Sequence, residues 1–249
     1  MAPNVDWHAR YLQQAVWTSK TREYLCENAD FNKAHRILDV GCGTGALLSE
    51  SPTRTTAEIH GLDICLDNTR MARRNAPAAR LTCGDGHYLP YPDGGFDIVF
   101  CHFLLLWVKS PVTVLREMKR VTRPGGALLA MAEPDYAGRI DYPPELVPLG
   151  RWQAESLLRQ GADPDAGRKL KGWFVTAGID PIESGIIAGR WTGFSSPEEQ
   201  EMEWSVIESD LAGTIPSAEI QRIKSVDAKA WERGERVLFV PTFYTWGRV

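Results

Sequence analysis

The sequence lacks the usual signatures of a metal site, a disulfide framework and a membrane anchor. Its five cysteines contain no CxxC pair, which favours free thiols in a reducing compartment. Its five histidines contain no HExxH motif and no paired ligand spacing, so we expect no metal site. No apolar run approaches the roughly 20 residues that span a bilayer, and residues 1–11 lack the apolar segment of a secretory signal. These absences predict a cytoplasmic protein.

A strong charge of one sign is missing as well. The 28 Lys and Arg residues against 32 Asp and Glu residues give a formal net charge of -4. Such a chain has no broad positive field to attract nucleic acids or anionic membranes, and no basic stripe with interleaved aromatics compensates. We therefore expect neither nucleic acid nor a membrane as a partner. With 43% hydrophobic residues in 249, the chain can build the core of one α/β domain.

Residues 37–45 carry the most information. They read Ile-Leu-Asp-Val-Gly-Cys-Gly-Thr-Gly, an apolar strand with an acid near its end that breaks into alternate glycines. Glycine has no Cβ, so the backbone can turn sharply and approach a ligand closely. A helix is expected to begin at residue 46, with its N-terminal N–H groups directed at whatever fills the turn. The pattern predicts a nucleotide-type pocket where a strand passes into a helix.

Strands and helices are expected to alternate along the first half of the chain. Apolar spacing predicts a helix over about 6–28, which we interpret, within 1–30, as an N-terminal helical lid. Strands follow at 36–40, 58–64, 79–83, 96–101 and 127–132, separated by helices at 46–50, 65–75 and 111–122 and by a Pro-Gly-Gly stop signal at 123–126. This order predicts a Rossmann-like, doubly wound α/β fold with a mostly parallel sheet.

The second half is expected to complete a seven-stranded sheet. Helices are predicted at 152–160 and 169–177, and strands at 182–193 and 236–246. The polar, helix-prone stretch at 196–234 between those strands is interpreted as a helical cap insertion. We expect the whole chain, 1–249, to form a single domain.

The glycine turn alone fits two classes of cofactor. The residues from Gly41 to Ala46 also match the dinucleotide fingerprint G-x-G-x-x-G/A, with an acid 20-odd residues on at Asp63. However, Asp39 lies two residues before the first glycine, where it would repel a pyrophosphate but suit the ammonium of an amino-acid moiety. Asp85 follows the third strand in a Gly-Asp-Gly run, positioned to accept from an exocyclic amine such as that of adenine. Asp39 thus favours a cofactor with an amino-acid moiety over NAD, and Asp85 suits an adenine.

Five motifs, in one order, extend this reading: Leu-Asp-Val-Gly-Cys-Gly-Thr-Gly at 38–45, Leu-Asp-Ile at 62–64, Gly-Asp-Gly at 84–86, Phe-Asp-Ile-Val at 96–99 and Arg-Pro-Gly-Gly at 123–126. With them the chain resembles the class I S-adenosylmethionine-dependent methyltransferases, specifically their small-molecule branch. The resemblance is close over roughly 35–135 and elsewhere holds only for the order of elements. It implies S-adenosyl-L-methionine as cofactor, S-adenosyl-L-homocysteine as product and a small organic acceptor.

The resemblance also implies roles for individual residues. Gly41, Gly43 and Gly45 would wrap the methionine part of the cofactor, and Tyr11 would cover it from the N-terminal lid. The other implied contacts are Asp39 and the Cys101 carbonyl to the ammonium, Asp63 to the ribose, Ile64, Asp85 and Gly86 to the adenine, and His102 facing the methyl group. Asp63 as a strand-end cap, Ile64 as a core residue and Asp85 as an Asx-turn former are the open alternatives.

Methyl transfer from a sulfonium is an in-line displacement on an activated donor, so the protein mainly holds acceptor and methyl in near-attack geometry. A general base is needed only if the acceptor must lose a proton. The candidates are His102 after the fourth strand, and Glu133 and Tyr136 after the fifth, because active sites in open α/β sheets lie outside the carboxyl ends of the strands. Together with Asp135, the last two predict a polar pocket or a site for a cationic acceptor.

Two further functions stay open. One is a protein that binds S-adenosylmethionine for a non-methylating role, because methyl transfer demands little of side chains. An NAD-dependent oxidoreductase is the less favoured alternative, for the reasons of charge given above. The acceptor atom, N, O or C, is not fixed by any motif, and exposed apolar lids allow a homodimer.

Overall fold

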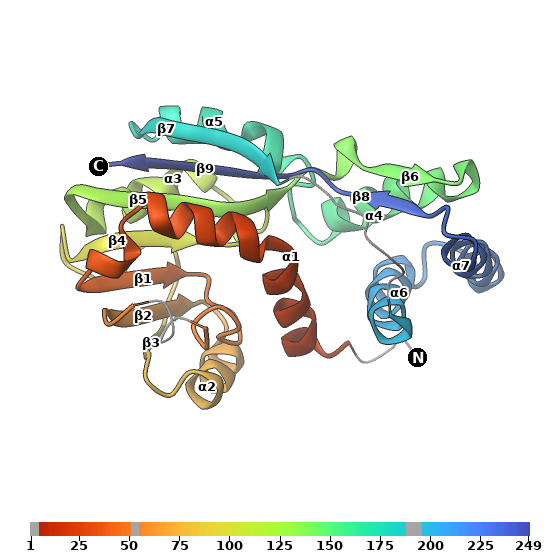
Figure 1. Ribbon diagram of the computed structural model, residues 1–249, viewed down its shortest axis with the longest axis horizontal. Helices are drawn as coiled ribbons and strands as arrows, with labels where there is room; N and C mark the ends of the chain where they lie inside the picture. The colour runs from red at the N-terminus through yellow and green to blue at the C-terminus, as the bar shows by residue number, and fades with distance from the viewer. Residues whose placement is uncertain (1–4, 51–54, 188–195) are drawn as a thin grey trace.

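The computed structural model describes residues 5–50, 55–187 and 196–249. Its centre is a sheet of seven strands in the order β3-β2-β1-β4-β5-β9-β7 (Figure 1). β9 is antiparallel to both of its neighbours, and the other four pairings are parallel. The predicted Rossmann-like, mostly parallel seven-stranded sheet is confirmed. Its strands are β1 (Arg36–Val40), β2 (Glu58–Asp63), β3 (Arg80–Cys83), β4 (Phe96–Cys101), β5 (Thr122–Pro134), β7 (Asp180–Ile187) and β9 (Thr242–Arg248).

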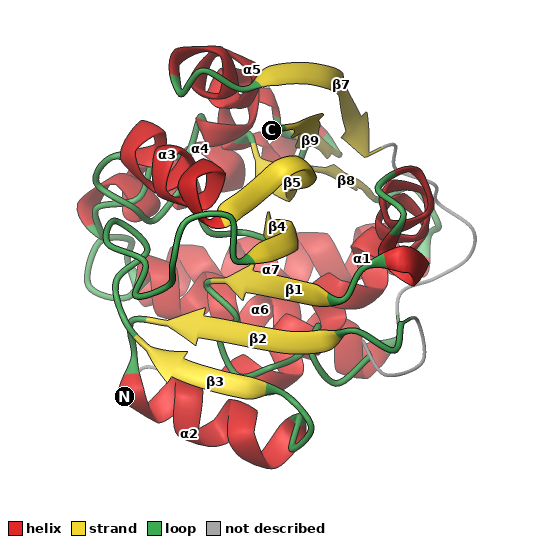
Figure 2. Cartoon of the chain, turned by 90° about the vertical axis from the view of Figure 1, so that its left-hand side faces the viewer, coloured by secondary structure: helices red, strands yellow, loops and turns green. Residues whose placement is uncertain are grey.

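Helices pack on both faces of the sheet because successive residues of a strand point to opposite sides. Leu38 of β1 joins a core cluster with α3 and α5, whereas its neighbour Ile37 joins the opposite cluster with Leu25 of α1. Figure 2 shows α2 beside the β3 edge. The helices are α1 (Trp7–Asn28), α2 (Leu66–Asn75), α3 (Pro111–Val121), α4 (Val147–Arg159), α5 (Ala166–Thr176), α6 (Pro197–Leu211) and α7 (Ser217–Glu232).

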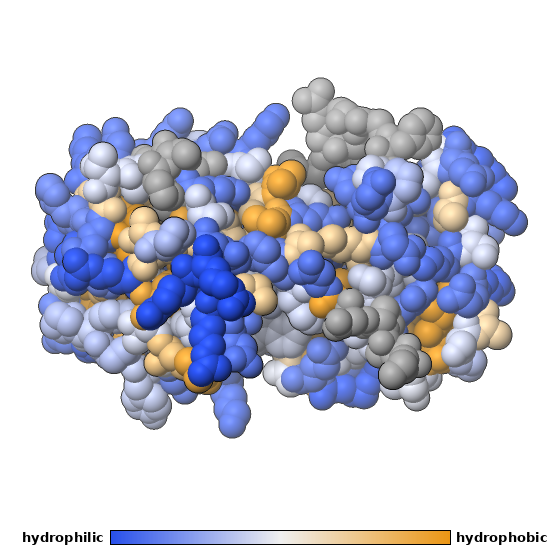
Figure 3. Space-filling model, turned by 90° about the horizontal axis from the view of Figure 1, so that it is seen from below, coloured by the Kyte–Doolittle hydropathy of each residue, from blue (hydrophilic) through white to orange (hydrophobic). Residues whose placement is uncertain are grey.

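A smaller helical body lies beyond the carboxyl ends of the parallel strands. Trp204 and Ile207 of α6, Ile223 of α7 and Leu149 of α4 share its own apolar core. A two-stranded sheet of β6 (Ile140–Tyr142) and β8 (Val237–Phe239) belongs to the same end of the molecule. α6 and α7 thus occupy the stretch in which helices were predicted, 196–234. Seen from below, the two ends of the molecule meet at a narrower waist that carries apolar side chains (Figure 3).

Four sequence expectations differ from the structure or reach beyond its described residues. Residues 46–50 form turns and no helix. Gly45 before them has a left-handed φ of +82°. The hydrogen bond from Ser49 N to Gly45 O spans four residues, but the next, from Glu50 N to Leu47 O, spans three, so no regular helical ladder forms. The Pro-Gly-Gly run lies inside β5, where the register with β4 shifts. The strand predicted at 182–193 is β7 as far as Ile187; residues 188–193 lie outside the described part.

The fourth correction concerns the strand predicted at 236–246, which is two strands in different sheets. β8 pairs with β6, and β9 pairs with β5 and β7. Pro241 stands between them and has no N–H to contribute to a ladder, while its carbonyl accepts a bond from Asp135 N (2.8 Å). The chain therefore leaves the small sheet at Pro241 and enters the large one. Among the described helices, none is long and apolar enough to cross a membrane.

Candidate active site

The glycine turn follows β1 at the carboxyl ends of the parallel strands. Gly41, Gly43 and Gly45 have φ angles of +80°, +53° and +82°, a region that favours glycine. A Cβ on Gly41 would lie 2.7 Å from a methyl carbon of Leu104, and one on Gly43 would lie 3.3 Å from the Tyr11 ring. No side chain fits at either position without displacing a neighbour.

α1 lies against this turn at two points. The Tyr11 ring covers Gly43, and burial, with the nearby carboxylate of Asp63, raises the pKa of the Tyr11 phenol. One turn earlier, His8 Nδ1 lies 2.7 Å from the Thr44 hydroxyl. The predicted N-terminal lid helix is therefore in contact with the glycine turn. The contact of Tyr11 with the cofactor itself remains a prediction.

Asp39 is a buried acid with an unmatched oxygen. Its side chain is 2% exposed, and its Oδ1 has no hydrogen-bond partner. Burial, together with the charge of Asp63, raises the pKa of Asp39 to about 8, and Arg22 opposes the shift only in part. Leaving a buried acceptor unpaired costs free energy. An ammonium group at this point would supply the missing donor.

Asp63 ends β2 and holds the first turn of the site together. Its Oδ2 accepts from Gly43 N at 2.9 Å, and its Oδ1 accepts from Cys65 N at 2.9 Å and from Asn68 Nδ2 at 3.2 Å. These bonds realise the strand-end cap that the sequence left open as an alternative. A carboxylate oxygen has two acceptor sites, so the bonds leave capacity for one ribose hydroxyl on Oδ2.

The residues predicted for adenine lie together beyond β2 and β3. Ile64 is 71% exposed, so the core alternative for this residue is wrong. Gly86 lies over Val40, which a Cβ at Gly86 would contact at 3.4 Å. Asp85 Oδ1 accepts from His87 N at 2.9 Å and contacts His87 Nδ1 at 2.7 Å. The Asx turn is therefore present, and those two bonds use one oxygen of the two.

β4 ends at the fully buried Cys101, and His102 follows it. Burial, with the charge of Arg22, lowers the pKa of His102 to about 3, so its imidazole is neutral at physiological pH. Its Nε2 lies 2.9 Å from the hydroxyl of Thr18 in α1, which also accepts from Arg22 Nε at 3.1 Å. A group with so low a pKa is a weak proton acceptor. The arrangement supports a positioning role for His102 more than the predicted role of a base.

Glu133 does not face an open space. It is fully buried and accepts three backbone bonds, from Leu104 N (3.0 Å), Leu105 N (2.8 Å) and Leu106 N (3.1 Å). Burial raises its pKa to about 7, and these three bonds oppose the shift. Both of its oxygens are used to hold the loop after β4, which argues against a catalytic role.

The cationic-acceptor pocket predicted from Glu133, Asp135 and Tyr136 does not form as expected. Asp135 pairs with Arg168 of α5, with 2.7 Å between Asp135 Oδ1 and Arg168 Nη2, so neither carboxylate is directed to a ligand. Tyr136 is the member of the three that lines a cavity. Within the described ranges, no group of three or more His, Cys, Asp and Glu residues could hold a metal ion.

That cavity has a volume of about 590 Å³ and lies between α1, α6 and α7. Phe103, which follows His102, opens onto it and has a φ of +52°, an unusual angle for a bulky residue. Other side chains that line the cavity are Arg10, Trp17, Glu203, Trp204, Asp227 and Arg236. The cavity therefore adjoins the end of β4, where the methyl group is predicted to lie.

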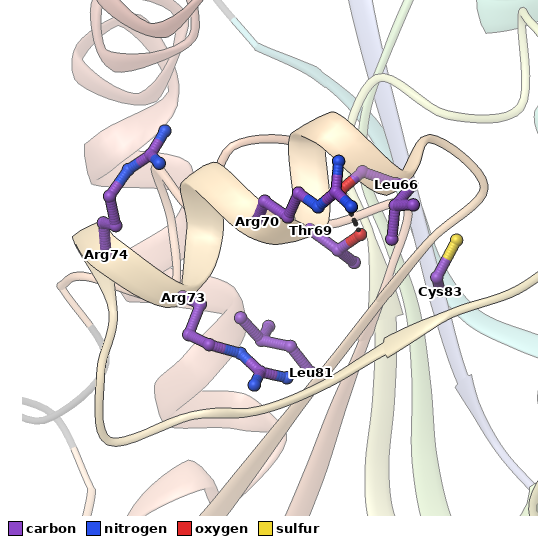
Figure 4. Close-up of a pocket in the computed structure, with 7 residues that line it drawn as sticks. All are labelled: Leu66, Thr69, Arg70, Arg73, Arg74, Leu81 and Cys83. Carbon is purple, nitrogen blue, oxygen red and sulfur yellow. Dashed lines mark hydrogen bonds between the residues drawn. The ribbon is translucent and has the colours of Figure 1, made fainter.

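A second, more open hollow of about 450 Å³ lies between α2 and β3 (Figure 4). Arg70, Arg73 and Arg74 line it above Leu81 and Cys83 of β3. All three arginines are exposed, as expected for a solvated helix face.

Sequence reasoning missed several residues of the site. Thr18 was foreseen as part of the N-terminal lid but not as a partner of His102, and Arg22 only as part of a helix, although an i, i+4 pair of polar residues was visible in the sequence. Arg10 reaches Glu203 (2.6 Å) across 193 positions, and no local pattern announces that pair. His87, two residues after Asp85, could have been found by asking what holds an acid in a Gly-rich turn.

Comparison with known proteins identifies the family. A model of the methyltransferase domain matches residues 38–130. An uncharacterized methyltransferase from Schizosaccharomyces pombe is 30% identical over 221 residues, 81% of this chain and 78% of that protein. A malonyl-[acyl-carrier protein] O-methyltransferase from Erwinia pyrifoliae is 35% identical over 91% of this chain and 82% of its own. A demethylmenaquinone methyltransferase from Streptomyces avermitilis is 36% identical over 71% and 82%.

Solved structures agree on the fold. A methyltransferase candidate from Bacillus halodurans C-125 superposes with a TM-score of 0.63 at 15% identity, covering 93% of this chain and 97% of that one. The [4+2]-cyclase SpnF superposes with a TM-score of 0.61 at 20% identity, covering 93% and 80%. The glycine turn, the buried acid before it and the sequence relatives lead to one conclusion: the chain belongs to the class I S-adenosylmethionine-dependent methyltransferases.

Proposed function

We propose that the protein transfers a methyl group from S-adenosylmethionine to an uncharged, mainly apolar small metabolite bound in the cavity between α1, α6 and α7. The observation that carries the proposal is the cavity itself, whose 590 Å³ lies within the range of small-molecule sites. Its aromatic walls, Trp17, Phe103, Tyr136 and Trp204 among them, suit an apolar body.

The arginines that line the cavity are paired within the protein. Arg10 pairs with Glu203 at 2.6 Å, and Arg236 pairs with Asp227 at 2.5 Å and with Asp141 at 2.8 Å. Arg139 pairs with Asp141 as well, at 2.7 Å. A charged acceptor would have to displace one of these partners and leave a buried charge uncompensated, which is costly. An uncharged acceptor leaves all of them in place.

The cofactor would lie along the glycine turn. We assign its ammonium to Asp39 and the Cys101 carbonyl, its ribose to Asp63, and its adenine to Ile64, Asp85 and the Gly86 N–H. When bound it supplies an activated methyl group. The protein's own contribution is to orient the acceptor: Phe103, next to the neutral His102, lines the cavity beyond β4, and Tyr136 contributes a phenol to the same cavity. The aromatic walls exclude water from the reacting atoms.

A product assay tests the proposal. The protein is incubated with S-adenosylmethionine and matched pairs of hydrophobic alcohols or phenols and the corresponding carboxylates, and S-adenosylhomocysteine and the methylated product are measured. Turnover is expected with the uncharged member of a pair. Turnover restricted to the carboxylates would contradict the charge argument.

Cavity filling provides a matched control. Val240→Trp adds bulk to the cavity wall and is expected to lower kcat/KM for the acceptor at least about tenfold, the loss of roughly 1.4 kcal/mol, with the cofactor Kd unchanged. Val175→Trp makes the same change on the exposed side of α5, where Val175 is 58% exposed, and should have no effect. Equal activity of the two variants would show that the acceptor binds elsewhere.

The non-methylating alternative is a separate outcome of the same assay. Cofactor binding without S-adenosylhomocysteine formation, for every acceptor that binds the cavity, would favour it.

The lid role of residues 1–30, the cap role of 196–234 and the single-domain organisation also stay proposals. So does a homodimer, for which exposed apolar side chains of α1, such as Trp7 and Val16, are the candidate surface; light scattering at two concentrations tests it.

A further inference from the structure

The hydrogen bonds around His87 define which of its ring nitrogens carries the proton. Ser110 donates its backbone N–H to His87 Nε2 at 3.3 Å. A nitrogen that accepts a hydrogen bond has no proton of its own, so in the neutral ring the proton is on Nδ1. Nδ1 lies 2.7 Å from Asp85 Oδ1 and therefore donates to it.

These bonds leave the second oxygen of Asp85 for a ligand. Oδ1 accepts two bonds from His87, one from the backbone and one from the ring, which fills its acceptor capacity. They also lower the pKa of Asp85 and so keep it an acceptor at neutral pH. The Asp85 side chain is 45% exposed, so Oδ2 can be reached from solvent.

His87 is itself held at its far side. Its side chain is 18% exposed, and Ser110, whose N–H it accepts, is the N-cap of α3, with Ser110 Oγ accepting from Thr113 N. The chain of contacts runs from the first turn of α3 through the imidazole to the carboxylate. Such a support restricts the orientation of the acid that a ligand meets.

We propose that His87 is a positioning residue that orients Asp85 to recognise the 6-amino group of the cofactor's adenine, and so sets the preference for adenosyl over deaminated, inosyl ligands. The inference rests on the adenine assignment made under the proposed function. An amino group donates to the carboxylate, whereas the 6-keto group of hypoxanthine is an acceptor and would oppose it. The ratio of the affinities for the adenosyl and the inosyl ligand is therefore the quantity to measure.

The experiment is a calorimetric titration of the full chain with S-adenosylhomocysteine and with S-inosylhomocysteine. The wild type is expected to prefer the adenosyl ligand roughly 10- to 100-fold, as for one hydrogen bond to a charged group. His87→Ala is expected to lower this ratio at least about threefold, through weaker adenosyl binding with the inosyl Kd nearly unchanged. His87→Asn, whose side-chain amide can donate to Asp85, should restore part of the ratio. His35→Ala removes an exposed histidine of the opposite end of β1 and should change nothing.

Asp85→Asn distinguishes the positioning role of His87 from the assignment of adenine to Asp85. Its amide can donate to the keto group, so the ratio should fall to about one or reverse. If Asp85→Asn abolishes the preference and His87→Ala keeps the wild-type ratio, the role of His87 is overturned and the adenine assignment stands. If Asp85→Asn also keeps the wild-type ratio, the adenine assignment itself fails. A folding defect in His87→Ala would lower both affinities together, and the ratio, with His87→Asn beside it, remains decisive.

Discussion

Thr18 of α1 and His102 after β4 are joined by a contact of 2.9 Å between Thr18 Oγ1 and His102 Nε2, 84 positions apart in the sequence. Thr18 also donates to the carbonyl of Gln14 at 3.1 Å. A hydroxyl has one proton, so when Thr18 uses it for Gln14, His102 donates from Nε2. α1 thus contacts the side chain of His102, the neighbour of the cavity-lining Phe103, and this contact places a proton on Nε2 of the imidazole.

Removing the Thr18 hydroxyl should therefore affect turnover more than cofactor binding. Thr18→Val is expected to lower kcat about fivefold, the equivalent of roughly 1 kcal/mol for one hydrogen bond, with the Kd of S-adenosylmethionine within about twofold of wild type. Thr18→Ser keeps the hydroxyl and should retain most of the activity. The measurement is steady-state kinetics with calorimetry. Loss of activity in Thr18→Ser with wild-type activity in Thr18→Val would mean that the methyl group of Thr18, not its hydroxyl, matters.

His102 should not appear in the pH–rate profile. Burial lowers its pKa to about 3, so it is neutral at every pH between 5 and 9. His102→Asn should lower kcat without moving any apparent pKa of the profile in that range. A wild-type profile with an ionisation near 6.5 that disappears in His102→Asn would restore the role of a general base.

In the proposed site, cofactor binding requires the charged form of Asp39, whereas burial of that charge lowers the stability of the folded protein. Its pKa is raised from 3.8 to about 8 in the folded protein. A raised folded pKa means that the stabilising contribution is complete below pH 3.8 and is lost as the pH rises to about 8. Asp39→Asn should therefore increase the free energy of unfolding at pH 8 by at most a few kcal/mol, at about 1.36 kcal/mol per pKa unit. Thermal denaturation of the ligand-free protein at pH 5 and pH 8 measures it.

The same residue gives cofactor affinity a pH dependence. Asp39 must lose its proton to pair with an ammonium, so the affinity of the wild type for S-adenosylmethionine should rise between pH 6 and 7.5. Asp39→Asn should bind weakly and show no such rise. A variant with wild-type affinity across this range would remove Asp39 from the cofactor site.

Glu133 is expected to act on folding, not on chemistry. Glu133→Gln replaces one acceptor oxygen by an amide that opposes a backbone N–H of the loop at 104–106. It should lower the free energy of unfolding by about 1–3 kcal/mol, the cost of an unsatisfied buried group. Chemical denaturation and kcat are compared in the same preparation. A stable variant whose kcat falls a hundredfold would instead support the catalytic role suggested by the sequence.

Local chemistry explains what could be read from the sequence. The continuous run of buried residues in β1 and the glycines after it define the sheet and the turn, because both depend on neighbours within a few positions. The sequence shows a proline at 241, but it does not show that the chain changes from one sheet to another there. That change depends on the pairing of β8 with β6, a strand of three residues. Contacts such as Arg10 with Glu203 and Thr18 with His102 arise only when distant helices meet.

The identity of the cofactor and the role of Asp63 are tested by a calorimetric titration with S-adenosylmethionine and, separately, with NADH. The titration is carried out on the wild type and on Asp63→Ala. Thermal denaturation checks that the variant is folded, because Asp63 also bonds to Gly43 N and Cys65 N. We predict micromolar binding of S-adenosylmethionine to the wild type, loss of that binding in folded Asp63→Ala, and no binding of NADH. Binding of NADH alone, or unchanged binding of S-adenosylmethionine to Asp63→Ala, would contradict the account.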